Sequence, residues 1–309
     1  MTAAAVTVAV VSWNTRALLE RCLRSLEGDA RAGRAQVWVV DNGSSDGSRE
    51  LVRSDFAWAR LQEAEENLGF GRAVNLVARE TESEWIAPAN ADIELIPGAL
   101  ERLLATGASN PGAGAIAPRL LLPDGSTQHS VYTFPTVPAA LVLGAGLGRL
   151  SHRLGDRFCL LGRWDPERAR EVDWAVGAFM LVRREAFDAA GGFDERQWLF
   201  AEDLDLGWRL RRAGWRTRYD PGATVHHNES AATGAAFGAG RTARTMEATY
   251  DWMVRRRGPA RTIAVAGIGA LRMVFEYLLG GRSRRERARF WLGIHGAGVR
   301  RAAAAALRR

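Results

Sequence analysis

Short apolar runs alternate with amphipathic stretches over the first 115 residues, and this alternation constrains the fold more than any other feature of the chain. Residues 6–11 and 37–40 are largely β-branched runs of a length typical of buried strands. The segment NTRALLERCLRSL lies between them, and its apolar residues share one helical stripe: Leu18, Leu19, Cys22, Leu23 and Leu26. Strands and helices in alternation predict an α/β fold built around a mostly parallel sheet.

The same alternation continues along most of the chain. We expect a helix beginning at Asp46 or Ser48, a short strand beginning at Leu61, a glycine-rich turn before a helix in NLGFGRAVNLVARE, and a strand in EWIAPANAD. Residues 111–172 are rich in Gly and Pro with few clear periods, so they predict loops and short strands. Beyond them we expect a strand over 178–182, helices over 184–190 and in AEDLDLGWRLRRAG, and a last strand in TRYDPGATVHH.

Length and composition are those of a globular protein with a real core. The 309 residues are 47% hydrophobic and 25% charged, enough for one large or two small domains. The two cysteines, Cys22 and Cys159, are too few for a disulfide framework or a cysteine zinc site. We expect both to be reduced, buried thiols in a cytosolic protein.

The net charge of +7 is unevenly distributed. Residues 241–309 carry +12, which leaves −5 for the first 240 residues. A basic tail on an acidic body favours an anionic surface as partner.

Neither end of the chain predicts a membrane-crossing segment. The start, MTAAAVTVAVVSWN, has no charged region before its apolar stretch, so we expect no signal peptide. The longest apolar run of the tail, residues 263–271, is far shorter than the roughly 20 residues that span a bilayer. We therefore expect a protein that is neither secreted nor transmembrane.

Polar residues follow the second predicted strand at once. Asp41 and Asn42 end the strand, and small or polar residues continue to Ser48. In open α/β sheets ligands bind beyond the carboxyl ends of strands, and an Asp there can accept from the imide N–H of a pyrimidine base. The competing interpretation is an Asx-turn in which Asp46 caps the next helix, and these residues alone do not separate the two.

Three more segments contain candidate site residues. Gly69 and Gly71 precede a helix N-terminus, where free N–H groups favour phosphate, although the glycines also suit a plain tight turn. Asn90 and Asp92 end a strand at positions i and i+2, from which two oxygen-bearing side chains reach one hard divalent cation. Two imidazoles in TVHHNES could complete such a metal site or lie on the surface.

Three acids lie close together in WLFAEDLDLGWRLRRAGW. Glu202 and Asp205 share a helical face and Asp203 points elsewhere. The apolar residues around them predict a partly dry pocket, which raises a carboxylate pKa toward that of a general base. The alternative is that these acids only complement the dipole at a helix start.

Seven motifs in order resemble those of the family-two inverting glycosyltransferases, closest to the bacterial rhamnosyltransferase-like branch. They are VAVVSWNTRALLERCLRSL, VVDNGSSDGS, NLGFGRAVN, ANAD, VGAFMLVRREAFDAAGGFDE, FAEDLDLGWRLRRAGW and PGATVHHNES, and they cover about residues 6–235. The resemblance implies the A-type glycosyltransferase fold, a single Rossmann-like domain over residues 1–240. About residues 1–115 would bind a nucleotide sugar and 116–240 the acceptor, with 241–309 as a basic, amphipathic helical extension.

The resemblance also implies roles for single residues. Asp41 contacts the uracil or thymine imide, with Ser12 and Asn14 beside the nucleoside. Asn42, Gly69, Gly71, Asn75 and Asn90 complete the nucleotide-sugar site. Asn90 stands where the family's metal motif has its first Asp, whereas Asp92 keeps the second and binds a Mg²⁺ or Mn²⁺ ion together with His227. The family's Glu-Asp pair falls on Glu202 and Asp203, and Asp203 is the general base.

The implied reaction is a single displacement that inverts the anomeric carbon, with the cation and a helix N-terminus stabilising the diphosphate leaving group. The expected donor is dTDP-rhamnose and the expected acceptor a saccharide, free or on a polyprenyl diphosphate, in cell-surface glycan synthesis. The alternatives are another hexose from a UDP-sugar, or a catalytically inactive relative that only binds. An NAD-dependent oxidoreductase is disfavoured because no GxGxxG follows the first strand.

The tail mixes arginine with aromatic and aliphatic residues, including Phe290, Trp291, Leu292 and Ile294. Such a mixture favours a helix in the headgroup region of an anionic membrane, which would make the enzyme peripheral at the inner face of the plasma membrane. The alternative is a helix packed on the core with its arginines solvated. Nucleic acid is not an expected partner, because no recognition motif accompanies the charge.

Overall fold

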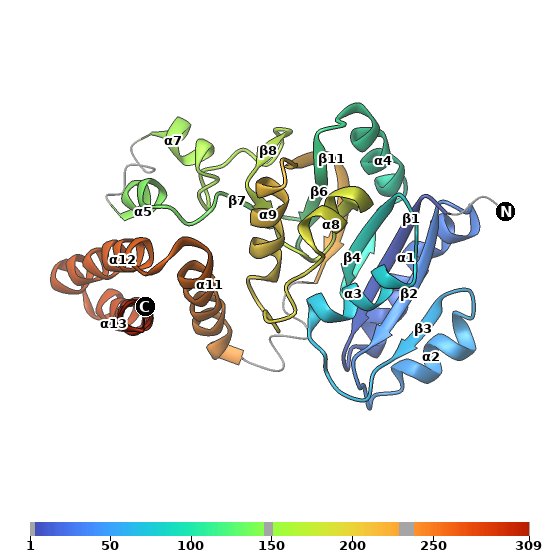
Figure 1. Cartoon of the computed structure of the whole chain (residues 1–309), viewed down its shortest axis with the longest axis horizontal. Helices are drawn as coiled ribbons and strands as arrows, with labels where there is room; N and C mark the ends of the chain where they lie inside the picture. Colours follow the sequence, from blue (N-terminus) through green and yellow to red (C-terminus); the bar gives the residue numbers. More distant parts are fainter. Residues whose placement is uncertain (1–3, 145–150, 229–237, 309) are drawn as a thin grey trace. The chain divides into compact units, whose positions relative to one another are not determined.

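The computed structural model describes residues 4–144, 151–228 and 238–308 (Figure 1). The chain forms two compact units. The first, which we call the sheet unit, comprises Met1–Val131 and Pro166–Gly238. The second, the helical unit, comprises Tyr132–Asp165 and Ala239–Arg309.

A nine-stranded sheet forms the centre of the sheet unit. The strands along its main path run in the order β3-β2-β1-β4-β10-β6-β11-β5, and β8 pairs with β11. Their bounds are β1 (Val6–Ser12), β2 (Ala35–Asp41), β3 (Arg60–Glu63), β4 (Trp85–Asn90), β5 (Ile93–Leu95), β6 (Ala113–Leu121), β8 (Arg170–Val172), β10 (Leu181–Arg183) and β11 (Arg216–His227). The pairs among β1 to β4 and the β6–β11 pair are parallel, whereas β10, β5 and β8 are antiparallel to their neighbours. The expected mostly parallel sheet is confirmed.

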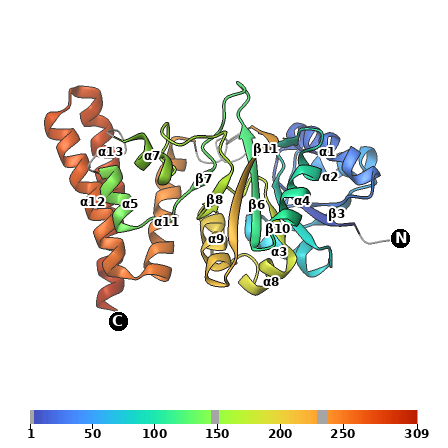
Figure 2. The same cartoon turned by 90° about the horizontal axis from the view of Figure 1, so that it is seen from above.

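Helices cover both faces of this sheet, as Figure 2 shows. One hydrophobic core packs α1 (Arg16–Arg31), α2 (Ser48–Asp55) and α4 (Ala99–Ser109) against residues such as Val8 and Val39. A second core packs α3 (Phe70–Arg79), α8 (Arg184–Ala190) and α9 (Glu202–Arg212) against the other face, at residues such as Ala9 and Val40. Neighbouring strand residues thus serve opposite layers, as the alternation of side chains along a strand requires.

The region expected to be loops and short strands contains a central strand. β6 is nine residues long, and its first six residues, AGAIAP, are all buried. A strand that is buried on both faces lacks the polar alternation by which strands are recognised, and small Ala and Gly residues gave no apolar run in its place. Gly114 is required there, because a Cβ would lie 2.6 Å from the side chain of Trp215.

The helical unit contains α5 (Val137–Gly144), α7 (His152–Arg157), α11 (Arg241–Arg257), α12 (Pro259–Leu279) and α13 (Arg282–Leu307). A 3-10 turn, η1 (Gly238–Gly240), precedes α11, and two short strands, β7 (Val131–Tyr132) and β9 (Trp174–Ala175), lie elsewhere in the chain. α12 and α13 lie side by side in both views. The Tyr250 hydroxyl bonds Nδ1 of His295 at 2.6 Å, and Phe134 stacks on Trp252 at 6.4 Å.

Two expectations about the tail change. Residues 132–165, assigned from sequence to the acceptor half, group instead with residues 239–309, because the apolar helix α5 packs on α12. Within the described residues, α12 is also long and apolar enough to cross a membrane by length and composition. The apolar run of the sequence, residues 263–271, ends because Arg272 follows it. In the structure the charge of Arg272 is paired with Glu276 at 3.2 Å.

Candidate active site

The carboxyl ends of three neighbouring parallel strands bring predicted site residues to one edge of the sheet. Ser12 of β1 is in register with Asp41 of β2, and Val11 of β1 is in register with Asn90 of β4. Ser12 and Asp41 are buried, at 0 and 1% exposure. Their position is the one at which open α/β sheets bind ligands.

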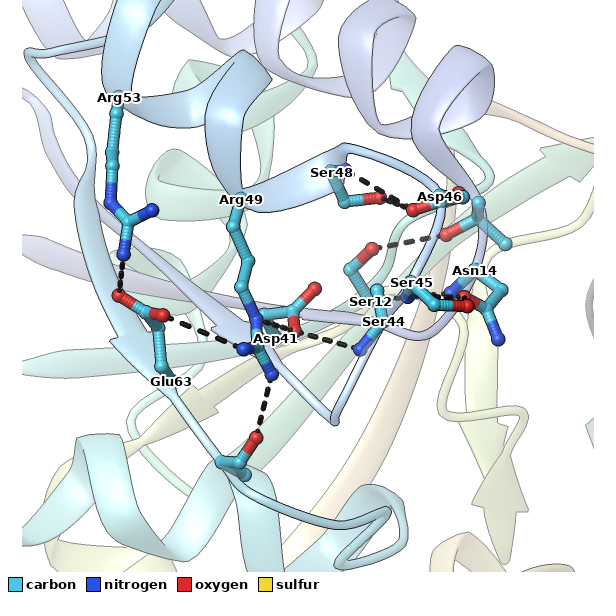
Figure 3. A network of polar contacts seen from close by, with 12 residues as sticks. Ser12, Asn14, Asp41, Ser44, Ser45, Asp46, Ser48, Arg49, Arg53 and Glu63 are labelled. Carbon is cyan, nitrogen blue, oxygen red and sulfur yellow. Dashed lines mark hydrogen bonds and ion pairs between the residues drawn. The ribbon is translucent and has the colours of Figure 1, made fainter.

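Asp41 is held by one carboxylate oxygen and keeps the other without a protein partner. Oδ1 accepts from the backbone N–H of Ser44 at 2.9 Å and from Nε of Arg49 at 2.7 Å (Figure 3). The same guanidinium donates to the carbonyl of Ala64 at 2.9 Å, which fixes it in place. Oδ2 is buried with no hydrogen-bond partner among the described residues. A buried carboxylate oxygen left over in this way is suited to an N–H donor from a ligand.

The turn after Asp41 is held by Asp46, as the competing interpretation of its sequence expects. Asp46 accepts from the N–H of Ser48 at 3.1 Å and, with its other oxygen, from the N–H of Arg16 at 2.7 Å. It therefore ties the start of α2 to the start of α1, while Asp41 keeps a free oxygen. Asn14 adopts a left-handed conformation at φ 52° and accepts from the N–H of Ser45 at 2.8 Å. Backbone outliers of this kind concentrate at ligand sites.

The glycines before α3 are required by a close approach of the chain. A Cβ on Gly69 would lie 2.2 Å from the carbonyl oxygen of Trp198, and one on Gly71 would lie 2.8 Å from Cβ of Phe193. Gly69 also adopts φ 81°, which L-residues avoid. Both glycines thus admit the segment 193–198 to the N-terminus of α3, and Nε1 of Trp198 completes the contact by donating to the carbonyl of Asn67 at 3.1 Å.

Two predicted site residues with amides differ in how their polar atoms are used. Asn42 is buried, and its Oδ1 has no hydrogen-bond partner among the described residues. Asn75 instead donates to the carbonyl of Phe193 at 2.9 Å and to Glu195 at 3.1 Å, and its Oδ1 accepts from the N–H of Phe193 at 2.9 Å. Asn42 therefore has an acceptor to offer a ligand, whereas the amide of Asn75 is committed to holding the turn after α8.

Asp92 and His227 lie next to each other where β5 pairs with β11. Nε2 of His227 lies 3.3 Å from Oδ1 of Asp92, and both side chains are buried, whereas His226 is exposed. The hydrogen bond between Asn228 N–H and the Asp92 carbonyl, 2.9 Å, and the pairing of β11 with β5 bring these residues together. Glu229 and Ser230, which follow in the motif PGATVHHNES, lie outside the described residues.

Gln128 completes this arrangement and was not predicted from sequence. Its Oε1 lies 2.7 Å from Nδ1 of His227, and Gln128 is 6% exposed. A His that donates from Nδ1 presents the lone pair of Nε2 to whatever it faces, here the partnerless Oδ1 of Asp92. Carboxylate and imidazole donors with such an outer hydrogen bond are a metal-binding arrangement.

The acid pair begins α9 under local backbone strain. Phe200 and Ala201, directly before Glu202, both have positive φ, at 64° and 61°. The Asp203 carboxylate is oriented by two N–H groups, from Gly177 at 3.1 Å and Leu204 at 2.7 Å. Residues in this conformation cost free energy and persist where the surroundings enforce them.

Burial raises the pKa of both acids. The pKa of Asp203 rises to about 6, and burial together with the charge of Asp203 raises the pKa of Glu202 to about 8. Oε2 of Glu202 is buried without a hydrogen-bond partner among the described residues. Burial and mutual repulsion thus favour a single negative charge on the pair, and the two N–H groups that contact Asp203 favour that charge on Asp203.

Asp205, the third acid of the cluster, has a structural role. It is fully buried and pairs with Arg209 of the same helix at 2.6 Å. Arg209 also donates to the carbonyls of Ala190 and Gly192, which ties α9 to the end of α8. The expectation that Asp203 points away from Asp205 agrees with these separate partners.

Backbone contacts connect the acid pair to the strand ends. The N–H of Asn90 donates to the carbonyl of Ala178 at 2.9 Å, and Gly177, the preceding residue, donates to Asp203. A Cβ on Gly177 would lie 3.5 Å from both Asp203 and the ring of Phe70 at the start of α3. The acid pair, the strand ends and the start of α3 therefore surround one region of the sheet unit.

Comparison with known proteins agrees with this arrangement. Residues 7–157 match the family described as glycosyl transferase family 2, and residues 166–272 match glycosyl transferase family group 2. An N-acetylglucosaminyl-diphospho-decaprenol L-rhamnosyltransferase of Mycobacterium tuberculosis is 34% identical over 93% of this chain and 98% of its own. The chain is a family 2 glycosyltransferase. The family expected from the seven motifs is thereby confirmed.

Other relatives and structures extend this result. The rhamnosyltransferase WbbL of Escherichia coli is 34% identical over 28% of this glycosyltransferase and 32% of its own length. Two solved structures share the fold: the mannosyltransferase PcManGT of Pyrobaculum calidifontis, solved with GDP-Man and Mn²⁺, and S. aureus TarS residues 1–349. Their TM-scores are 0.56 and 0.53 at 17 and 14% identity, over 97% of this chain and 86 and 82% of theirs. The expected A-type fold with a helical C-terminal region is confirmed.

Proposed function

We propose that this glycosyltransferase transfers L-rhamnose from dTDP-rhamnose to a saccharide carried on a polyprenyl diphosphate. The observation that carries the proposal is the 34% identity, over nearly the whole of both chains, to a mycobacterial L-rhamnosyltransferase named for a lipid-linked N-acetylglucosamine acceptor. The free Oδ2 of Asp41 can accept a hydrogen bond from an imide N–H, which supports a thymine or uracil base in the donor. Ser12, Asn14 and Asn42 lie beside it for the rest of the nucleoside.

In the proposed reaction Asp203 is the base. It takes the proton of the acceptor hydroxyl as that oxygen bonds the anomeric carbon, and the bond from this carbon to the nucleoside diphosphate breaks on the opposite face. The sugar configuration inverts in one displacement, and dTDP leaves with the electron pair. A proton on one carboxyl keeps the pair at a single negative charge, and the N–H groups of Gly177 and Leu204 favour that charge on Asp203.

A divalent cation fits Asp92 and His227. Among the described residues no three His, Cys, Asp or Glu side chains gather into a complete metal site. Mg²⁺ and Mn²⁺ are commonly held by one or two protein side chains together with substrate phosphates, which suits a pair of this kind with a partnerless carboxylate oxygen. When bound, such an ion would stabilise charge on the leaving diphosphate. Asn90, in place of an Asp, leaves the site one negative charge weaker.

A donor panel tests the function. Purified enzyme is given dTDP-rhamnose and several UDP- and GDP-sugars, with a polyprenyl-diphosphate N-acetylglucosamine as acceptor, and release of the nucleoside diphosphate is measured. We expect release to be fastest with dTDP-rhamnose and the anomeric configuration of the product to be opposite to that of the donor. Preference for a UDP-hexose would change the donor assignment, and absence of release with every donor would favour a non-catalytic relative.

We also propose that the enzyme works at the cytoplasmic face of the plasma membrane as a peripheral protein. A lipid-linked acceptor is confined to a membrane surface, and the tail of +12 is complementary to anionic lipids.

A further inference from the structure

The second half of α12 carries an exposed apolar stripe. Its five side chains are exposed by 58, 39, 57, 62 and 84%, in the order Leu271, Val274, Phe275, Leu278 and Leu279. Their spacing of three and four residues puts them on one face of the helix. A helix face that is left to water is ordinarily polar, so an apolar stripe of this size marks a contact surface.

The stripe is separate from the face with which α12 packs in the helical unit. The buried residues of α12 are Thr262, Ala266 and Met273. Between the two faces, Arg272 bonds Glu276 at 3.2 Å and donates to the carbonyl of Leu143 at 3.1 Å, so its charge is satisfied within the unit. The stripe is therefore surplus to the packing of these helices.

Arginines crowd the first two turns of α13, directly after the stripe. Arg282, Arg284, Arg285, Arg287 and Arg289 are all exposed. We call these five residues the arginine row. Cations at a helix N-terminus oppose the helix dipole and destabilise the helix, so the stability of α13 does not explain the arginine row.

Two of these arginines fold back onto α12. Arg285 donates to the carbonyl of Tyr277 at 3.2 Å, and Arg289 donates to the Tyr277 hydroxyl at 2.8 Å with its guanidinium 5.2 Å from the ring centre. Tyr277 belongs to the same stretch of α12 as the stripe. The row of positive charge thus borders the apolar surface.

We propose that this stripe and arginine row, together the α12–α13 surface, dock on a bilayer that contains anionic phospholipid. The apolar side chains enter the headgroup–acyl boundary, and the arginines contact lipid phosphates. A bilayer suits the charge of the surface better than a second copy of the chain in parallel pairing, which would oppose two arginine rows. The proposal deepens the proposed function, since it supplies the contact that brings the enzyme to a lipid-linked acceptor.

The α12–α13 surface differs from the one expected from sequence. Ile294 is buried, and Trp291 stacks on His295 at 5.8 Å, so these residues of α13 are turned inward. The aliphatic stripe of α12 replaces them. Phe290 of the expected group is 45% exposed and remains available.

Sedimentation with vesicles tests the proposal on the full chain. Vesicles of phosphatidylcholine alone and of phosphatidylcholine with phosphatidylglycerol are compared at low and high salt. We expect binding to the anionic vesicles that weakens with salt. The stripe variant Phe275→Ser/Leu278→Ser/Leu279→Ser should bind at least about tenfold less, given the apolar area it removes. The row variant Arg282→Gln/Arg284→Gln/Arg287→Gln should lose on the order of 100-fold, at about fivefold per arginine.

Control variants change exposed side chains of the same kinds elsewhere. Leu161→Ser/Leu307→Ser removes two exposed leucines outside the stripe, and Arg261→Gln/Arg300→Gln/Arg308→Gln removes three exposed charges outside the row. Both should bind as the unchanged protein does. Equal loss in the controls, or unchanged binding in the stripe and row variants, would overturn the proposal.

Two further measurements separate the other occupants. Alkaline carbonate should release the protein from cell membranes, and resistance to it would instead identify α12 as a membrane span. A dimer in solution that the stripe variant abolishes would assign the stripe to a second copy. Nucleoside diphosphate release with a short, water-soluble acceptor should be unchanged in every variant, so failure of docking and failure of the proposed function are distinguishable.

Discussion

His227 points Nε2 at Oδ1 of Asp92 from 3.3 Å, in a buried position. Its other nitrogen faces Oε1 of Gln128 at 2.7 Å, so a neutral His227 that donates there presents a lone pair to a carboxylate. Two acceptors at this distance repel each other. A proton on Nε2 would remove this repulsion, and so would a divalent cation held by Asp92 and His227, which would supply positive charge for the leaving diphosphate of the proposed reaction.

Metal removal is the direct test of this relationship. We expect excess chelator to abolish transfer and Mg²⁺ or Mn²⁺ to restore it, because the leaving diphosphate then loses a counter-charge. Asp92→Ala should weaken Mn²⁺-dependent binding of dTDP in calorimetry, and His227→Ala should do so to a lesser degree. His226→Ala is the matched control, since His226 is exposed, and should bind normally. Transfer that is indifferent to chelator would show that the site uses no metal.

Gln128→Leu should weaken Mn²⁺-dependent dTDP binding by about tenfold or more, the usual cost of losing an outer hydrogen bond to a metal-binding His. Binding of dTDP measured without metal should not change, which distinguishes a positioning role from general damage. Gln128→Glu, which keeps the acceptor oxygen, should restore much of the affinity. Gln36→Leu breaks a comparable bond to Thr7 elsewhere in the sheet unit and should leave binding intact. An equal effect of both Leu variants would contradict the prediction.

Asp203→Asn should lower kcat on the order of 100-fold or more, the usual contribution of a general base, and still bind the donor. The contrasting variant is Asp205→Asn, which leaves Arg209 buried without its partner. That variant should lower Tm markedly while each folded molecule keeps its kcat. Near-normal turnover by Asp203→Asn would remove Asp203 from the role of base.

The gathering of candidate site residues was predictable from sequence, because polar residues directly after apolar strands collect at one edge of a parallel sheet. Asp41, Asn90 and Asp92 are of this kind. Arg49 and Gln128 were missed for a physical reason. Each acts on a site residue from another element, and Gln128 is 99 residues from His227 in the chain. No local period records such a partner.

The fold was predictable to a similar extent. The prediction failed where the sequence has no hydrophobic periodicity. A helix such as α1 is recognised in the sequence by its single stripe of buried apolar residues. The strand β6 is buried on both faces, and its small residues form neither an alternating pattern nor an apolar run. The apolar length of α12 was underestimated from the single run 263–271, because the polar Arg272 and Glu276 interrupt the pattern in sequence but pair beside the stripe in space. Asn75 shows the converse case, since an amide in a recognised motif is occupied by the turn it holds.

Asp41→Ala should raise KM for the nucleotide-sugar donor by about 10- to 100-fold, the cost of a hydrogen bond to a charged group, with a smaller effect on kcat. Isothermal titration with dTDP should show the same loss in the absence of acceptor. Glu63→Ala is the control, because Glu63 is another partner of Arg49, at 3.7 Å, and its removal leaves the Asp41 carboxylate in place. If both variants bind dTDP equally well, the base contacts another residue.

The raised pKa of Asp203 predicts a pH dependence of the rate, and the raised pKa of Glu202 predicts a pH dependence of the stability. Because Asp203 must be ionised and its pKa is raised to about 6, kcat should fall as pH drops through about 6.

Glu202 has a folded-state pKa near 8 and a usual value of 4.5, so the folded state binds the proton more tightly than the unfolded state between these values. The free energy of unfolding therefore falls as pH rises from about 4.5 to about 8. Glu202→Gln removes this loss, and its Tm should exceed that of the unchanged protein at pH 8 by more than at pH 5. Glu195→Gln is the opposite case, because the hydrogen bond from Asn75 lowers the pKa of Glu195. Its Tm should lie below that of the unchanged protein at pH 8 and approach it as the pH falls below 4.5. A Tm difference for Glu202→Gln that does not change between pH 5 and pH 8 would mean that Glu202 is ionised in the folded protein.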